Sequence, residues 1–146
     1  MERKKLGPRS KARECAMQML YQWDITREPI DQVIPLFWQV RNATPTAKTT
    51  AERLVRGAQA SVNKLDEAIT SVSTNWRFDR IAPIDRNILR IAAYELMEEP
   101  ATPSLVAIDE AVELAKRFGE ADSPSFVNGV LDAIRTRVRR AREAKR

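Results

Sequence analysis

The chain has 146 residues, of which 43% are hydrophobic and 31% charged, a balance typical of a water-soluble protein with one continuous core. Its 25 Lys and Arg residues outnumber its 20 Asp and Glu residues, giving a net charge of +5, and no apolar run approaches the roughly 18 residues that span a bilayer. With no histidine, one cysteine and four scattered glycines, the composition excludes histidine-based catalytic triads, histidine-containing zinc sites, an internal disulfide and glycine-rich nucleotide-binding loops. No apolar secretion signal follows the basic N-terminus, so we expect a cytoplasmic protein with no membrane segment.

Positive charge is concentrated at the two ends of the chain. Residues 1–13 carry a net charge of +5 and residues 135–146 carry +6, whereas the residues between them carry −6. The net charge of the whole chain therefore hides an acidic body. This division indicates a polyanionic partner for the ends of the chain and a different partner for its body.

Helical periodicity interrupted by proline marks the N-terminal half. Apolar residues recur at i, i+3, i+4 and i+7 over residues 10–25, which predicts an amphipathic helix. Pro29 ends this pattern, and a short second helix is expected over 30–38. Residues 42–50 are rich in Thr, Ala and Pro and are expected to form a loop, after which the helical period continues to about residue 73. Periodicity alone leaves open whether this last stretch is one bent helix or two.

Three further helices are predicted after a linker over 76–83 that carries large apolar anchors. The segment 84–96 is apolar over most of its circumference and should be the central, most buried helix. Further helices are expected over about 103–118 and 123–138, each with a proline at its start. Gly129 inside the last helix costs about 1 kcal/mol relative to alanine, which predicts that another helix approaches closely there. Alternating strand patterns are missing, so we expect an all-α fold, a bundle of six or seven helices.

Basic residues stand at the start of the first predicted helix. Arg9, Lys11 and Arg13 lie where backbone N–H groups and the helix dipole also attract anions, so several interactions could hold a phosphate there. On charge alone, a solvating, disordered tail is an equal alternative. For the basic C-terminal run, the favourable interaction with a helix end gives stability and solubility more weight than binding.

Other candidate contact residues lie on the remaining helices. Phe126 follows the start of the last helix, where its ring can face outward to stack on a base, with core packing as the alternative. Tyr21 lies off the apolar stripe of the first helix and suits a protein contact. Asp79 and Asp85 flank a helix start, where they stabilise the dipole and can meet a basic protein. The carboxylates of residues 109–113 fit a solvated helix face better than an acid/base pair.

Four segments carry a specific pattern in order along the chain: RECAMQMLYQW (13–23), IDRNILRIAAYEL (84–96), VAIDEAVELAKRFG (106–119) and DSPSFVNGVLD (122–132). Together they resemble the NusB family of bacterial transcription antitermination factors, from the first helix to the last. The resemblance implies an all-helical, NusB-like fold of about seven helices in two packed subdomains, without catalytic activity or a cofactor. It also implies pairing with the ribosomal protein NusE, binding to boxA RNA of nascent transcripts, notably ribosomal RNA, and action in an antitermination complex on RNA polymerase.

The resemblance also assigns roles to residues. It places the RNA surface at Arg9, Lys11 and Arg13 and over the segment from Asp122 to Phe126, and the NusE surface at Tyr21, Asp79 and Asp85. Ser125 stands where the family often has a basic residue, and Ser10 interrupts what can be an unbroken arginine cluster in relatives, which bears on the strength of RNA contact. The acidic body then fits a basic ribosomal protein.

We expect a flexible basic segment over 1–9, one NusB-like domain over 10–138 with subdomains of about 10–75 and 76–138, and a basic tail over 139–146. Two alternatives remain. The chain could derive from the NusB-like domain of a ribosomal RNA methyltransferase, although it carries no glycine-rich cofactor loop and ends in a charged tail. It could also be a structural module that self-associates, since the sequence leaves monomer and homodimer open.

Overall fold

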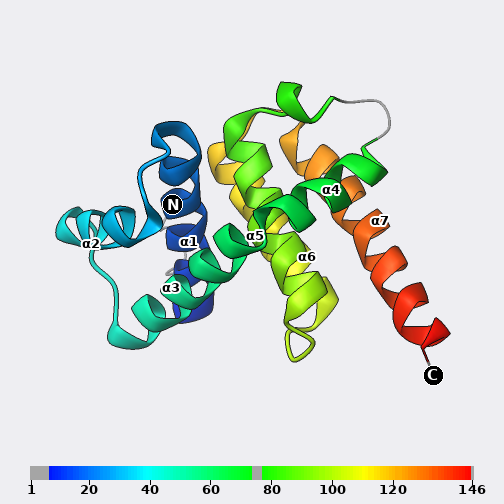
Figure 1. The fold of residues 1–146 in the computed structure, drawn as a ribbon, viewed down its shortest axis with the longest axis horizontal. Coiled ribbons are helices and arrows are strands. Elements are labelled where there is room, and N and C mark those ends of the chain that lie inside the picture. The colour runs from blue at the N-terminus through cyan, green and yellow to red at the C-terminus, as the bar shows by residue number, and fades with distance from the viewer. Residues whose placement is uncertain (1–6, 74–76, 146) are drawn as a thin grey trace, which may run out of the picture.

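Helices alone make up the regular structure of the part of the chain that the structure, a computed structural model, describes, residues 7–73 and 77–145 (Figure 1). The predicted all-α fold is confirmed. The basic residues before Gly7, the predicted anchor Trp76 and Arg146 lie outside the described residues. In chain order the elements are α1 (Pro8–Thr26), α2 (Ile30–Val40), α3 (Pro45–Ala60), α4 (Val62–Val72), the 3₁₀ helix η1 (Phe78–Arg80), α5 (Pro83–Glu98), α6 (Ser104–Phe118) and α7 (Ser123–Ala144).

The helical stretch after α2 is two helices. It begins at Pro45, so the loop expected over 42–50 ends earlier than predicted. The reason is a local cap, because the hydroxyl of Thr44 accepts a hydrogen bond from the backbone N–H of Ala47 and Pro45 fits the first turn. A break at Ser61 separates α3 from α4, which run on from one another across the molecule (Figure 1).

The central helix is α5, as its sequence predicts. Ten of its residues are buried, and it packs against α1, α3, α4, α6 and α7. The N-terminal helix α1 packs chiefly on α3 and α5, while α6 and α7 pack on each other and on α5. Although α4 precedes residue 75, it packs on α5 and α7, so in the packing it joins the helices that follow residue 76.

Two glycines in helices behave differently. A Cβ at Gly57 would clash with the ring and hydroxyl of Tyr94, so this glycine allows α3 to approach α5 closely. Gly129 is exposed, and nothing lies within 4 Å of the place where its Cβ would stand. The predicted close approach of a helix at Gly129 is therefore wrong, and the close approach occurs at Gly57.

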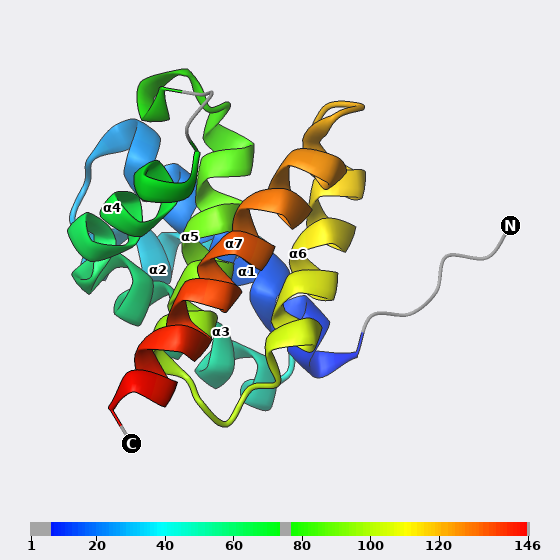
Figure 2. The ribbon, with the colours of Figure 1, turned by 90° about the vertical axis from the view of Figure 1, so that its right-hand side faces the viewer.

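The last helix is longer than predicted. Residues 139–144, expected to belong to a tail, continue α7 to Ala144. Arginine, alanine and glutamate favour helix strongly, and Arg142 also donates a hydrogen bond of 3.3 Å to the carbonyl of Leu96 at the end of α5. The basic C-terminal residues are thus arranged on an ordered helix that runs beside α6 (Figure 2).

Candidate nucleic-acid and protein interfaces

The start of α1 is open to an anion. Gly7 occupies the N-cap position without a side chain to cap the first N–H groups, and the first turn holds no acidic residue. Arg9 is exposed and Lys11 is half-exposed, its Nζ lying 3.7 Å from a carboxylate oxygen of Glu14. Exposed cations beside uncapped N–H groups at the positive end of a helix dipole form a surface that can hold phosphate.

Arg13 is largely buried, although it lines the same groove as Arg9, so its place on the RNA surface stays a prediction. Its guanidinium donates two hydrogen bonds, of 2.8 and 2.9 Å, to the carboxylate of Glu95 on α5, and both side chains are less than a tenth exposed. Burial opposes its charge, but Glu95 holds the pKa of Arg13 above its usual value. The helical spacing carried a signal, since Met17, Leu20 and Asp24 follow Arg13 at four, seven and eleven residues and are all buried.

An open groove of about 820 Å³ lies beside the start of α1, between the beginning of α3 and the connection from α5 to α6. Arg9 and Ser10 line it from α1, and Pro103 and Val106 line it from α6. Ser10 donates a hydrogen bond of 2.8 Å to Glu110, so this serine ties α1 to α6. The groove therefore places exposed Arg9 next to the start of α6.

Asp122 and Phe126 lie away from the start of α1. Ser10 meets Glu110, and Glu14 meets Arg117 at 2.6 Å, so α1 runs beside α6 in the same direction. Arg9 lines the groove at the start of α6, whereas α7 begins after the end of α6 (Figure 2). Arg9 therefore lies at the opposite end of α6 from Asp122 and Phe126, whereas Lys11 pairs with Glu14, which also binds Arg117 in the last turn of α6.

The start of α7 has an acidic neighbourhood. Asp122 is exposed at the N-cap position, and Phe126 is half-buried against the core. Both line a small pocket of about 150 Å³ that also contains Asp85 and Glu120. The hydroxyl of Ser123 accepts from the backbone N–H of Glu120 and donates to Asp85 at 2.8 Å, which joins the start of α5 to the start of α7.

Of the three residues expected at the protein interface, Asp79 and Asp85 lie near the start of α5, and Tyr21 lies one turn before Asp24, which binds that helix start. Asp24, one turn after Tyr21, accepts hydrogen bonds of 2.6 and 2.9 Å from Arg86 and one of 3.1 Å from Asn87, which fixes the end of α1 against α5. Tyr21 is half-exposed, and Asp79 on η1 is exposed. This end of the molecule therefore offers a tyrosine and a carboxylate to a partner.

Asp85 is buried, unlike Asp79. Burial raises the pKa of its carboxyl, the hydrogen bond from Ser123 lowers it, and the negative charges of Asp122 and Glu120 raise it further. Its Oδ1 has no hydrogen-bond partner among the described residues. Asp85 lines the small pocket that it shares with Phe126.

Arg117 is a candidate that the sequence analysis did not single out. Its guanidinium lies 4.9 Å from the ring centre of Phe118 and forms the ion pair with buried Glu14. The side chain is still 40% exposed, and it stands between the two predicted parts of the RNA surface. Its position in the last turn of α6 suggested only a favourable helix end, because Glu14 lies far away in sequence.

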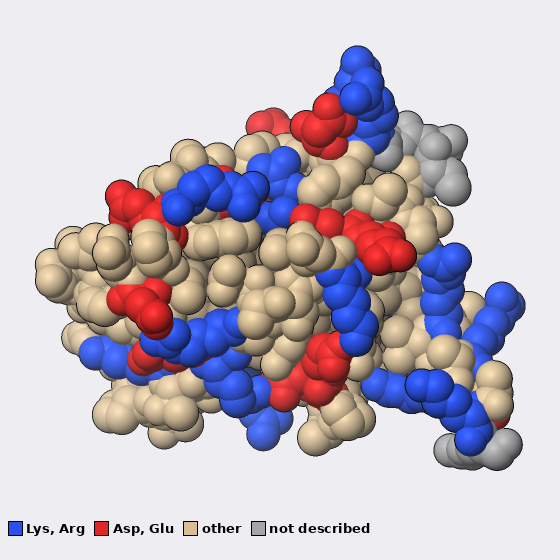
Figure 3. Space-filling model, viewed as in Figure 1, with Lys and Arg blue, Asp and Glu red and all other residues tan. Residues whose placement is uncertain are grey.

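The described part of the chain contains neither a candidate membrane-spanning helix nor a candidate metal-binding cluster. Within residues 7–73 and 77–145, no helix has the length and apolar character needed to cross a bilayer. The same residues contain no group of three or more Cys, Asp or Glu side chains placed to hold a metal ion. Basic and acidic side chains are both exposed on the face of the molecule shown in Figure 3.

Known proteins match this chain over most of its length. The sequence model of the NusB family covers residues 10–136. The transcription antitermination protein NusB of Sorangium cellulosum is 45% identical over 129 residues, which make up 88% of this chain and 92% of that protein. The protein of the same name from Anaeromyxobacter dehalogenans (strain 2CP-1) is 45% identical over 141 residues, 94% of this chain and 97% of the relative.

Solved structures share the fold. T. maritima NusB is 35% identical with a TM-score of 0.80, over 90% of this chain and 93% of that one. A chain in the crystal structure of antitermination factors NusB and NusE in complex with double-stranded RNA is 27% identical with a TM-score of 0.78, over 88% of this chain and 96% of that one. From the match to the family and the identity to its members, the chain belongs to the NusB family.

Proposed function

We propose that this chain is a transcription antitermination factor that pairs with the ribosomal protein NusE and binds boxA RNA of nascent transcripts, notably ribosomal RNA. It acts in the cytoplasm, within an antitermination complex on RNA polymerase, by binding rather than by catalysis. The observation that carries this proposal is the similarity, over 88% of the chain, to the structure of NusB and NusE with RNA. Relatives named transcription antitermination protein support the same role.

The RNA surface begins at α1. Arg9 and Lys11 contact phosphates together with the uncapped N–H groups of the helix. Phe126 and Asp122 contribute at the other end of α6, and Arg117 lies between the two sets. Arg13 positions α1 on α5 through its ion pair with Glu95.

The NusE surface is the acidic end of the molecule. Tyr21 and Asp79 are accessible there, and Asp85 is reached through its pocket. A ribosomal protein is basic as a class, and acidic side chains favour its approach by complementary charge. Pairing therefore leaves the basic start of α1 available for RNA.

The decisive experiment titrates boxA-like RNA against this chain with and without the NusE partner, with RNA affinity read by fluorescence anisotropy. We expect the pair to bind far more tightly than either protein alone. Equal affinity with and without the partner contradicts the proposal.

The double variant Arg9→Ala/Lys11→Ala tests the RNA surface. It should weaken binding and reduce the slope of log affinity against log salt by about 1.4, at roughly 0.7 per phosphate contact. Arg56→Ala, which removes an exposed arginine paired with Asp31 on another face, is the matched control and should leave the slope unchanged.

Two further assays address the alternatives. Binding of S-adenosylmethionine, measured by calorimetry, would favour derivation from a methyltransferase. Light scattering with and without RNA reports on homodimers, and a dimer that persists with RNA bound argues against a masking role for self-association.

A further inference from the structure

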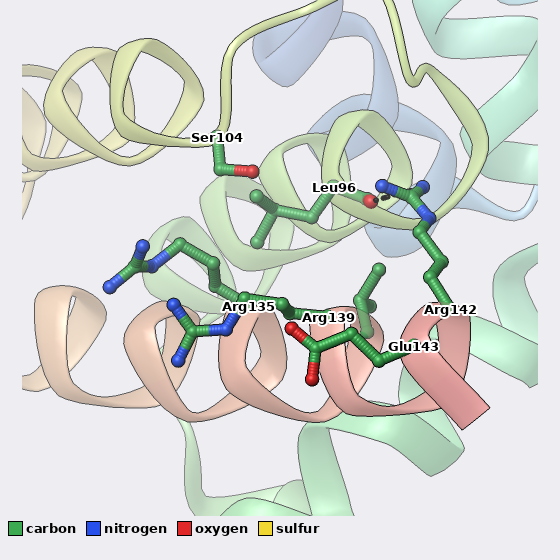
Figure 4. A pocket seen from close by; sticks show the side chains of 7 residues that line it. Leu96, Ser104, Arg135, Arg139, Arg142 and Glu143 are labelled. Carbon is green, nitrogen blue, oxygen red and sulfur yellow. Dashed lines mark hydrogen bonds between the residues drawn. The ribbon is translucent and has the colours of Figure 1, made fainter. Parts of the chain in front are cut away.

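Three arginines form a stripe along the C-terminal half of α7. Arg135, Arg139 and Arg142 stand at i, i+4 and i+7 and line one side of a pocket of about 250 Å³ with Leu96, Ser104 and Val138 (Figure 4). At 1.5 Å per residue, their backbone positions are spaced by about 6 and 4.5 Å along the helix axis. The spacing allows neighbouring phosphates of one strand to meet successive arginines. We call these three residues the α7 arginine stripe.

The arginines of the α7 arginine stripe are not fully paired within the described chain, so they can bind an anionic ligand. Arg139 makes no ion pair with any described residue, whereas Arg135 pairs with exposed Asp132 at 3.0 Å and Arg142 bonds only to the carbonyl of Leu96. Glu143 is the one acidic side chain that lines the pocket. The stripe is therefore basic overall.

The start of α6 faces the same pocket. Its N-cap residue Pro103 has no side chain that can cap the helix, its first turn holds no acidic residue, and Ser104 lines the pocket. The uncapped N–H groups add their partial positive charge to that of the stripe. Leu105 and Val106 beside them are 61% and 40% exposed, so the described residues leave this helix start accessible.

The start of α6 also connects the stripe with the start of α1. Pro103 and Val106 line the groove beside Arg9, while Ser104 lines the pocket beside the stripe. The start of α1 and the end of α7 thus flank the start of α6 at one end of the molecule (Figures 1 and 2). Lys and Arg side chains gather over the C-terminal end of α7 in the space-filling view (Figure 3).

We propose that the α7 arginine stripe and the start of α6 form a second RNA contact site, which holds the phosphate backbone of nucleotides that flank the segment bound at α1. Guanidinium groups bind phosphate oxygens through paired hydrogen bonds, and contacts to the backbone alone position the RNA without reading its sequence. This inference rests on the proposed function, because it assumes that RNA is bound at the start of α1. It assigns to the end of α7 a role that neither Asp122 nor Phe126 fills.

The test compares two RNAs in the presence of saturating NusE partner: a core boxA RNA and the same core extended by flanking nucleotides on both sides. The triple variant Arg135→Gln/Arg139→Gln/Arg142→Gln should lower affinity for the extended RNA on the order of tenfold and reduce its salt slope by about 2, at roughly 0.7 per contact. Affinity for the core RNA should stay unchanged. Arg139→Gln alone, which breaks no contact within the described chain, should show about a third of the change in slope.

Arg140→Gln is the matched control, because Arg140 is exposed on the same helix but does not line the pocket. Thermal unfolding of each variant verifies the fold. Unchanged affinity of the triple variant for the extended RNA, while Arg9→Ala/Lys11→Ala still weakens it, overturns the second site and leaves the proposed function intact. A triple variant that loses affinity for NusE, with RNA affinity unchanged, also overturns the second site. If the wild-type pair binds neither the core nor the extended RNA, the proposed function itself is refuted.

Discussion

The two ends of α6 present opposite surfaces. At its start, exposed Arg9 and the α7 arginine stripe lie beside two helix starts that lack side-chain caps. At its end, Asp85, Glu120 and Asp122 share a small pocket, and Ser123 joins their helices through hydrogen bonds. The fold therefore brings basic residues from both ends of the sequence to one end of the molecule. The two regions differ in the sign of the charge that they present to a ligand.

The largest expected effect concerns Arg13. Its charge is buried in an ion pair with Glu95, whereas Arg9 on the same helix is exposed. Arg13→Ala leaves Glu95 buried without its partner, so we expect the free energy of unfolding to fall by about 3–5 kcal/mol in urea denaturation. The double variant Arg13→Met/Glu95→Leu removes both charges and should recover most of this loss. If the double variant is stable yet loses RNA affinity as Arg9→Ala does, Arg13 contacts RNA after all.

Asp24 should give the next largest effect, with a pH dependence. Burial raises the pKa of its carboxyl, but hydrogen bonds from Arg86 and Asn87 and the charge of Arg90 bring it below the usual value. Glu14 behaves in the same way, since Arg41 and Arg117 outweigh its burial. Because both pKa values are lowered on folding, the stability they contribute is present above the unfolded value near 4 and is lost as pH falls through the folded values.

Asp24→Asn should therefore cost roughly 2–3 kcal/mol at pH 7, and the difference from wild type should shrink below about pH 4. Urea denaturation at several pH values measures this. Asp132→Asn removes an exposed carboxylate that pairs only with Arg135 and serves as the control, with an expected change of a few tenths of a kcal/mol. A constant difference across pH would show that charge is not the cause.

Gly129→Ala should increase stability. The position is exposed on α7 with open space around it, so replacing glycine gains about 0.5–1 kcal/mol of helix propensity. Chemical denaturation of the isolated protein measures the gain, and Gly57→Ala, which meets Tyr94, should lose stability instead. If the backbone of a partner packs closely against the start of α7, Gly129→Ala should weaken binding of that partner while it stabilises the free protein. Measuring the affinity of the variant for NusE and for RNA separately then shows which of the two binds at this end.

Local patterns predicted the helices well, because each helix buries its own apolar stripe. The stripe from Ala12 to Trp23 and the buried circumference of α5 are both present in the structure. The predicted helix ends were less accurate. The cap at Thr44 begins α3 earlier than predicted, and strong helix formers continue α7 past Val138. Such ends depend on single hydrogen bonds that a periodic pattern does not contain.

The candidate site was harder to predict, because it depends on pairs far apart in sequence. Arg13 and Glu95 are 82 residues apart, and Asp85 and Ser123 are 38 apart, so nothing near either residue in the chain indicates its partner. Exposed Arg9 and Asp79 were predictable as open charges, since neither depends on such a pair for its position. Charge type is readable from sequence, whereas the availability of a charge is decided by tertiary contacts.

The smallest expected effect is at Asp85 and tests the acidic end directly. Its pKa is raised on folding, so ionisation costs stability at neutral pH, and this cost disappears as pH falls through the raised value. Asp85→Asn should therefore raise the free energy of unfolding at pH 7 and leave it unchanged at low pH. The gain is small because the variant also loses the favourable interaction of the carboxylate with the start of α5. The same variant should weaken NusE binding, measured by calorimetry, while Asp31→Asn on α2 leaves both quantities unchanged. Unchanged NusE affinity in Asp85→Asn would place this carboxylate outside the NusE surface.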